Sequence, residues 1–478
     1  MLSGSSRDIP PLVVPEACRH TGPRRRGIQQ TWRTLLNLPS TDHTRAERHA
    51  DWVERDRTRI WHGFTQMSTF AENAPIIVER AEGRELIDVD GWRYLDAISS
   101  LWVTTLGHNL PELNEAIVDQ LGRVSHTTML GHGNKATIEL AEALTPRVPV
   151  ADPRFLFASD GAAAVEQALK IAFQYWVNQG VEGRDTYLSF GGAYHGDTIG
   201  SVSVGADGFG TDIFNPLRFD VVRAPGFDDP ACMTEAVRMI AEHRDSLAAV
   251  VVEPLVQGAA GIQVLGAEHF LPLAAACREH DVLLLVDEVA TGFGRTGTLF
   301  ASDQIRSLGD FAPDLMAMGK GLTGGYLPMS ATVAAGHVAD AFLGPDLGPK
   351  TLYHGHSFSG NAASAAAALA HLRLFDEWDV LAQVQTSAAH MAHALAAQIA
   401  ALPQVREVRQ CGLMVGIELA PPVDGLLWGR RTAKSCVEQG VLVRPLGDVI
   451  VLMPILTSTP DEIERIVEAT AVAIAGLG

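Results

Sequence analysis

The chain has 478 residues, which is enough to bury a large core, so we expect two domains. Its net charge of −19 and pI near 5.3 argue against nucleic-acid binding, which needs a basic surface. No apolar run reaches the length of a membrane span, and the five cysteines are scattered and never in C-x-x-C spacing. We therefore expect a soluble, cytoplasmic protein that does not bind membranes.

Residues 1–58 are predicted to form an N-terminal extension, because "PPLVVPEACRHTGPRRRG" combines prolines and clustered arginines without a sustained period. The start lacks the apolar core of a secretory signal, while its arginines leave a transit peptide as an alternative. Residues 59–110 are assigned to a small domain, with β structure from Ile76 and turns at Glu82-Gly83 and Asp90-Gly91. A helix is then expected near 110–121.

Residues 111–372 are predicted to form a large α/β domain. The stretches 154–158, 247–254 and 281–288 are short and apolar, as expected for strands of a mainly parallel sheet covered by helices. Residues 373–478 should return to a small α+β domain, with a helix near 379–401, strands near 413–419 and 440–444, and a last helix from 460. Thr459 and Glu462 predict a capping box at the start of that helix.

Two residues of the large domain suggest covalent chemistry. Asp287 directly follows a strand, where ligands of open α/β sheets bind, although such an aspartate could equally cap a turn. Lys320, one of only five lysines, lies in the apolar stretch "MGKGLTGG" and is either a desolvated nucleophile or a surface side chain. Together they suit pyridoxal phosphate, whose aldehyde needs an amine and whose ring nitrogen needs an acidic partner.

A phosphate site and an aromatic ring would complete such a centre. In "FASDGAAAVEQALK", a strand turns into a helix, so the N–H groups of Gly161 and Ala162 are candidate phosphate donors. Tyr194 in "GGAYHGDT" could stack on a flat ring, whereas His195 is as easily structural.

Two motifs carry weaker alternatives. "GFGRTG" matches the dinucleotide pattern G-x-G-x-x-G, but five residues separate it from its strand and the following "TLFASDQI" is a poor amphipathic helix. A nicotinamide-dependent oxidoreductase is therefore a less favoured alternative. "HGH" at 354–356 lacks a third ligand, so no metal site is predicted.

The motifs taken together resemble the class III aminotransferases of fold type I, and within them the biotin-pathway branch. The resemblance extends from about Ile60 to Val467 and is carried by "SDGAAAVEQALKIAFQYW", "YHGDTIGSVSV", "EPLVQGAAG", "VDEVATGFGRTG", "GKGLTGG" and "HGHSFSGN". It implies a pyridoxal-phosphate transferase fold and a homodimer with shared active sites.

The resemblance also implies roles for individual residues. Lys320 would bind the cofactor covalently and move a proton, and Asp287 would hold the ring nitrogen protonated. The cofactor-binding set would be Gly161, Ala162, Tyr194, Asp287, Val289 and Lys320, with His356 and Ser357 reaching the neighbouring subunit's cofactor. The substrate-binding set would be Phe64, Leu101, Trp102, Gly355 and Arg444.

Several positions depart from the family pattern. Ala162 replaces a serine, and His356-Ser357 replace a Pro-Thr pair. Phe64 stands where the biotin branch has tyrosine, and Leu101 stands where it has a pocket-lining tryptophan. We therefore expect an aminotransferase that takes its amino group from S-adenosylmethionine for a keto or aldehyde acceptor in biotin or specialised metabolism. The alternative is a pyridoxal-phosphate enzyme that uses S-adenosylmethionine as a carbon donor and releases methylthioadenosine.

Overall fold

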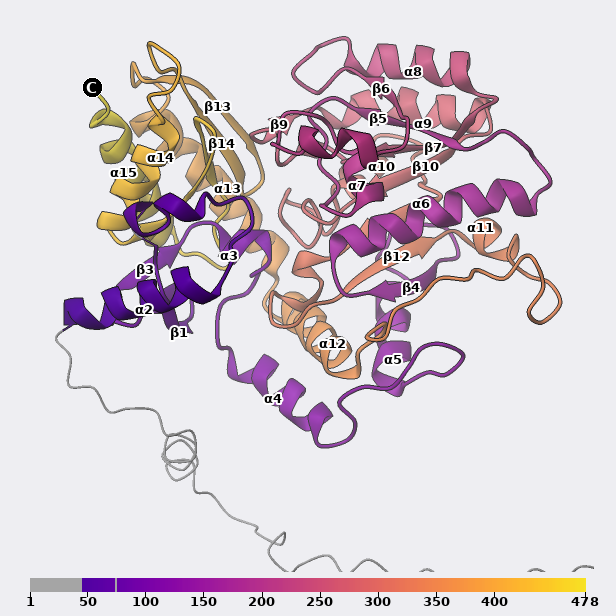
Figure 1. Cartoon of the computed structure of the whole chain (residues 1–478), viewed down its shortest axis with the longest axis horizontal. Coiled ribbons are helices and arrows are strands. Elements are labelled where there is room, and N and C mark those ends of the chain that lie inside the picture. The colour runs from indigo at the N-terminus through magenta and orange to yellow at the C-terminus, as the bar shows by residue number, and fades with distance from the viewer. Residues whose placement is uncertain (1–44, 74) are drawn as a thin grey trace, which may run out of the picture.

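The computed structural model describes residues 45–73 and 75–478, which form two lobes (Figure 1). Most of the predicted extension, residues 1–44, lies outside the described part. Its last residues, however, form helix α2 (Arg45–Arg59), which the sequence did not predict. Within the described residues, no helix combines the length and apolar character needed to cross a membrane.

The larger lobe is built on a seven-stranded sheet. Its strands, in spatial order, are β4 (Arg154–Ala158), β12 (Ser330–Ala334), β11 (Leu315–Met318), β10 (Leu283–Asp287), β7 (Leu247–Val252), β5 (Thr186–Phe190) and β6 (Val222–Ala224). The five strands from β11 to β6 run parallel, whereas β12 is antiparallel to both neighbours. The expected mainly parallel sheet is therefore confirmed. Strands β7 and β10 are buried along their whole length, because helices cover both faces.

Helices pack around this sheet. They are α4 (Pro111–Leu121), α5 (Lys135–Leu144), α6 (Gly161–Asn178), α7 (Ile199–Val204), α8 (Cys232–His243), α9 (Phe270–Glu279), α10 (Ala301–Arg306), α11 (Gly336–Asp340) and α12 (Ala362–Glu377). Helix α6 buries Val165, Leu169 and Trp176 of its predicted apolar face and leaves Phe173 exposed. Its first turn begins directly after β4, so it delivers its N-terminus to the carboxyl edge of the sheet.

The smaller lobe joins segments from both ends of the described chain. Strands β1 (Val78–Glu82), β2 (Glu85–Asp88) and β3 (Arg93–Asp96) form a meander, and β3 pairs in parallel with β15 (Val441–Leu442). A second sheet has the order β13 (Val405–Cys411), β14 (Met414–Leu419), β17 (Val449–Leu452) and β16 (Arg444–Leu446). Helices α13 (Val380–Gln398), α14 (Trp428–Glu438) and α15 (Pro460–Ala475) cover it. Thr459 and Glu462 form the predicted capping box of α15.

Each lobe has its own hydrophobic core. The core of the large lobe surrounds β7 and β10, and that of the small lobe gathers side chains such as Leu95, Val415 and Ile466. The short helix α3 (Ser99–Trp102) lies where the two lobes meet (Figure 1). Residues just after β3 therefore lie beside the carboxyl edge of the large sheet.

Candidate active site

A cavity of about 850 Å³ opens at the carboxyl ends of the large-lobe strands. Strands β4, β5, β7, β10 and β11 each contribute residues at or just beyond their ends, as expected for an open α/β sheet. Helix α3 lines the opposite wall. The cavity brings together eight of the predicted site residues: Leu101, Trp102, Gly161, Ala162, Tyr194, Asp287, Val289 and Lys320.

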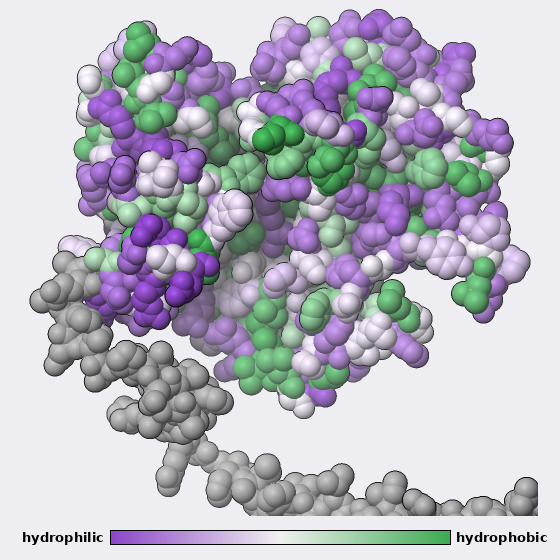
Figure 2. Space-filling model, in the orientation of Figure 1, coloured by the Kyte–Doolittle hydropathy of each residue, from purple (hydrophilic) through white to green (hydrophobic). Residues whose placement is uncertain are grey.

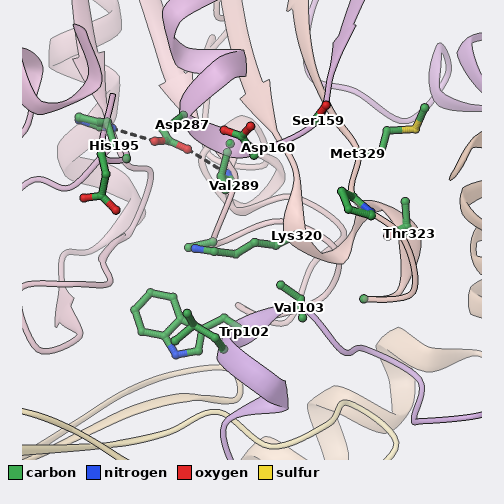
Figure 3. A pocket seen from close by; sticks show the side chains of 18 of the residues that line it. Trp102, Val103, Ser159, Asp160, His195, Asp287, Val289, Lys320, Thr323 and Met329 are labelled. Atoms are coloured by element: carbon green, nitrogen blue, oxygen red, sulfur yellow. Dashed lines mark hydrogen bonds and ion pairs between the residues drawn. The ribbon is translucent and has the colours of Figure 1, made fainter. Parts of the chain in front are cut away.

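Asp287 forms the acidic end of the cavity. Its Oδ2 lies 2.7 Å from Nδ1 of His195, and its Oδ1 accepts the Val289 N–H at 3.0 Å (Figure 3). Both side chains of the pair are almost fully buried. The sequence did not decide whether His195 has a structural role. Its contact with Asp287 shows that it orients the Asp287 carboxylate. Its Nε2 has no hydrogen-bond partner within the described residues.

Lys320 follows β11 and reaches into the cavity below Asp287 and Val289 (Figure 3). Burial lowers the pKa of its ammonium to about 8, while the charges of Asp287 and Glu253 oppose this shift. The glycine that follows is required by packing, because a Cβ at Gly321 would lie 2.8 Å from Cβ of Phe293. The apolar surroundings that made this lysine unusual in the sequence thus favour its neutral, nucleophilic form.

Glu253 is a functional candidate that the sequence analysis did not single out. It follows β7 and is buried, and its carboxylate accepts the N–H groups of Tyr194 and Gly258, each at 3.1 Å. Burial raises its pKa to about 7, and the neighbouring charge of Asp287 adds to this effect. The glutamate at the end of the apolar stretch "LAAVVVEP" was the available signal.

The start of α6 provides the candidate phosphate site. The Asp160 side chain caps the helix by accepting the Ala163 N–H at 2.9 Å, and Gly161 and Ala162 precede that residue at the cavity wall. A Cβ at Gly161 would lie 2.6 Å from Cγ1 of Val289, so glycine allows the strand end and the helix start to approach each other. The roles of Gly161 and Ala162 in phosphate binding remain predictions.

Tyr194 lines the cavity and donates its hydroxyl to Oδ2 of Asp197 at 2.8 Å. Burial, followed by the bond to Asp197, raises the pKa of the phenol well above its usual value. Arg444 lies within electrostatic range of Tyr194, and burial lowers its pKa. Arg444 is not part of the cavity wall itself.

The remaining predicted site residues lie outside this cavity. Phe64, Gly355 and Ser357 are exposed, and His356 is partly buried on the segment between α11 and α12. In the part of the chain that the structure describes, no group of three histidine, cysteine or acidic side chains is arranged to hold a metal ion. The predicted contacts of these residues with cofactor or substrate therefore remain predictions.

The "GFGRTG" stretch joins the lobes. Arg295 is buried, and its guanidinium donates to the carbonyl oxygens of Thr104 and Pro454, each at 2.7 Å. Burial lowers the pKa of Arg295 to about 9. The poor helix expected after this stretch is the short α10, whose start is held by Glu288 through the N–H groups of Ala301 and Ser302.

The donor set fits pyridoxal phosphate. A buried amine for the aldehyde faces a buried carboxylate for the ring nitrogen, and a helix N-terminus for the phosphate completes the cavity. The fold and the site thus define a pyridoxal-phosphate enzyme of fold type I. More particularly, the chain belongs to the class III aminotransferase family, whose model, "Aminotransferase class-III", matches residues 67–474.

Individual relatives agree with this assignment. The chain is 43% identical to an adenosylmethionine-8-amino-7-oxononanoate aminotransferase of Nitratidesulfovibrio vulgaris, over 90% of this chain and 82% of the relative. The crystal structure of the protein of that name from Methanocaldococcus jannaschii superposes with a TM-score of 0.86 at 38% identity, covering 89% of this chain and 98% of the other. A PLP-bound amine transaminase from an uncultivated Pseudomonas species gives a TM-score of 0.82 at 32% identity, covering 88% and 99%.

Proposed function

We propose that this aminotransferase takes the amino group of S-adenosylmethionine and transfers it to a keto or aldehyde acceptor, with 8-amino-7-oxononanoate as the first acceptor to test. The observation that carries the proposal is the buried Lys320 in the same cavity as the His195–Asp287 pair. The names of the relatives supply the two substrates. Because those relatives are aminotransferases, they do not favour the carbon-donor alternative.

Each residue of the cavity would have its own role in the reaction. Bound pyridoxal phosphate supplies an aldehyde that carries the amino group and an electron sink for charge at the substrate α-carbon. Asp287, fixed by His195, would hold a proton at the ring nitrogen. Lys320 would take a proton from the substrate carbon and return it, which requires the neutral amine that burial favours. Gly161 and Ala162 would bind the phosphate.

We assign the acceptor to the wall of the cavity that α3 forms. Leu101 and Trp102 of α3 provide apolar surface there, and Arg444 would receive a carboxylate through electrostatic attraction. Leu101 leaves more space than the tryptophan of the biotin branch would. The choice of acceptor is therefore proposed to depend on Leu101.

We also propose that two copies of the chain form a homodimer in the cytoplasm. The surface from α4 to α5 and the adjoining loop exposes apolar side chains that include Val118, Leu121, Val124, Leu130 and Phe358. Figure 2 shows apolar residues gathered over α4 on this face. The His126 ring lies 2.6 Å from the carbonyl oxygen of Ser357 and packs near Phe358, so this α4–α5 surface also carries His356 and Ser357. Exposed apolar surface of this kind marks interfaces.

One experiment tests the proposed reaction. The purified protein with bound pyridoxal phosphate is mixed with S-adenosylmethionine, and its visible absorption and the products are followed by spectroscopy and mass spectrometry. Loss of the yellow band with formation of the keto product of the donor supports amino transfer. Release of methylthioadenosine without the keto product would establish the carbon-donor alternative, and the absence of any change would remove S-adenosylmethionine as a substrate.

A further inference from the structure

Helix α3 is a left-handed turn made without glycine. Its four residues have positive φ angles: 49° at Ser99, 51° at Ser100, 89° at Leu101 and 70° at Trp102. The turn closes through hydrogen bonds from the Trp102 N–H to the Ile98 carbonyl at 2.8 Å and from the Val103 N–H to the Ser99 carbonyl at 2.9 Å. Left-handed geometry is unfavourable for every residue other than glycine, so the surrounding structure must hold the turn.

The buried carboxylate of Asp96 holds the turn. Its Oδ1 accepts the N–H groups of Ile98 at 3.3 Å and Ser100 at 3.0 Å. Its Oδ2 accepts the Ser100 hydroxyl at 2.9 Å and lies 2.9 Å from Nε2 of His108. Asp96 is 1% exposed, so these bonds form away from water, where they are strongest.

The left-handed turn determines where the Trp102 side chain lies. Its ring centroid lies 4.7 Å from Nζ of Lys320, and Figure 3 shows the indole and the amine facing each other across the cavity. The ring is backed by Gly258, where a Cβ would lie 3.1 Å from Cζ3 of Trp102. Because the direction of a side chain follows from the backbone angles that carry it, loss of the left-handed turn would move the Trp102 ring from its place over Lys320.

We propose that Asp96 is a positioning residue for the reaction: it holds the left-handed turn Ser99–Trp102 so that the Trp102 ring covers the Lys320 amine. The ring excludes water from one side of Nζ, while Asp287, Glu253 and Arg295 are the charged groups that act on the amine from the other elements. This role deepens the proposed function, because it rests on Lys320 as the reactive amine. Asp96 itself does not line the cavity.

The test measures the ionisation of Lys320 in protein freed of cofactor. Lysines are reductively methylated with ¹³C-formaldehyde and titrated by NMR, which is practical because the chain has only five lysines. A Lys320→Arg variant identifies the signal. Asp96→Ala should release Trp102, admit water, and raise the pKa of Lys320 by about one unit, since the loss of desolvation favours the ammonium. Asp96→Asn keeps one acceptor oxygen and should give a smaller shift.

Asp88→Ala is the matched control. Asp88 is 2% exposed and accepts the N–H groups of Asp90 and Trp92 and the Tyr94 hydroxyl, so its loss also removes a buried carboxylate from the same meander. It is not part of the cavity wall, and the Lys320 titration should stay unchanged.

Two results would overturn the proposal: an unchanged Lys320 titration in Asp96→Ala, or an equal shift in Asp88→Ala. If Asp96→Ala does not fold, Ser100→Ala removes one of the four bonds to Asp96 and should shift the titration in the same direction by a smaller amount. An unshifted Ser100→Ala would then count against the proposal. Because the measurement uses neither donor nor acceptor, it stands even if the substrate assignment fails.

Discussion

Nδ1 of His195 lies 2.7 Å from Oδ2 of Asp287, and both side chains are almost fully buried. The histidine comes after β5 and the aspartate ends β10, so the fold joins residues that are 92 positions apart. The other carboxylate oxygen accepts the Val289 N–H. The carboxylate that would meet the ring nitrogen is thus held at both oxygens.

His195→Phe should therefore lower kcat by about tenfold or more, because a buried charged group that loses a hydrogen bond costs about 1–3 kcal/mol. His195→Asn, whose amide nitrogen takes the place of the imidazole Nδ1 and can still donate to Asp287, should keep most of the activity. Steady-state kinetics of both variants at saturating cofactor is the measurement. Equal losses of kcat in the two variants would show that the rate does not depend on the hydrogen bond between residue 195 and Asp287.

Replacement of Lys320 by alanine should abolish turnover, with a loss of at least about 10²- to 10⁴-fold, the usual contribution of a general acid–base group. The visible band of covalently bound cofactor should also be absent. Lys135→Ala is the control, because this side chain is 82% exposed and pairs with Glu139 on its own helix. A Lys320→Ala protein with full activity would refute the assignment of the reactive amine.

The pKa of Lys320, lowered to about 8 by burial, predicts how the rate of cofactor loading depends on pH. Only the neutral amine attacks an aldehyde, and the neutral fraction rises as the pH rises toward the pKa. Loading of cofactor-free protein should therefore accelerate about tenfold per pH unit below pH 8 and level off above it. Stopped-flow absorbance gives the rates. A rate that continues to rise to pH 10 would indicate an amine with an ordinary pKa.

The parts of the site that the sequence predicted are those with a local signal. Asp287 ends an apolar strand, Lys320 follows one, and Gly161 lies at a strand-to-helix turn, so each could be recognised from its immediate neighbours. The pairing of His195 with Asp287 depends on the order of β5 and β10 in the sheet, which no local pattern encodes. The left-handed turn at Ser99–Trp102 contains no glycine that would have indicated positive φ angles.

The strength of the local sequence signal also explains which elements of the fold were predicted and which were not. The strands β7 and β10 and the capping box of α15 have strong patterns and were predicted. Helix α2 is dominated by charged residues, and its low apolar content hid it in the sequence. Strand β12 is antiparallel within a mainly parallel sheet, and its direction follows from the connection after Lys320 rather than from its own composition.

Phe358→Glu should weaken the proposed dimer. Phe358 is 63% exposed and lies against His126 on the α4–α5 surface, so a buried carboxylate there would be costly in a dimer interface. Sedimentation velocity should show a shift from dimer to monomer, together with loss of activity if His356 and Ser357 serve the neighbouring site. Val472→Glu on α15 is the control, because Val472 is 57% exposed on the other lobe. A wild-type protein that is monomeric and fully active would contradict the shared-site proposal.

Leu101→Trp tests whether acceptor choice depends on α3. Leu101 lines the cavity and is 44% exposed, so a tryptophan at this position adds apolar surface on the acceptor side. If the natural acceptor is 8-amino-7-oxononanoate, the added contact should raise kcat/KM for it about fivefold or more, since burial of further apolar area contributes on the order of 1 kcal/mol. The rate of the donor half-reaction, measured in single turnovers with S-adenosylmethionine, should change less, because the substitution adds surface on the acceptor side.

Leu101→Met keeps the volume of the side chain and should leave both half-reactions near the wild-type rates. A fall in kcat/KM for 8-amino-7-oxononanoate in Leu101→Trp, with an unchanged donor half-reaction, would mean that the cavity is shaped for a different acceptor. A panel of keto and aldehyde compounds would then be tested as acceptors with Leu101→Trp and Leu101→Met. The compound whose turnover falls most in Leu101→Trp would identify the class of acceptor that needs the space at Leu101.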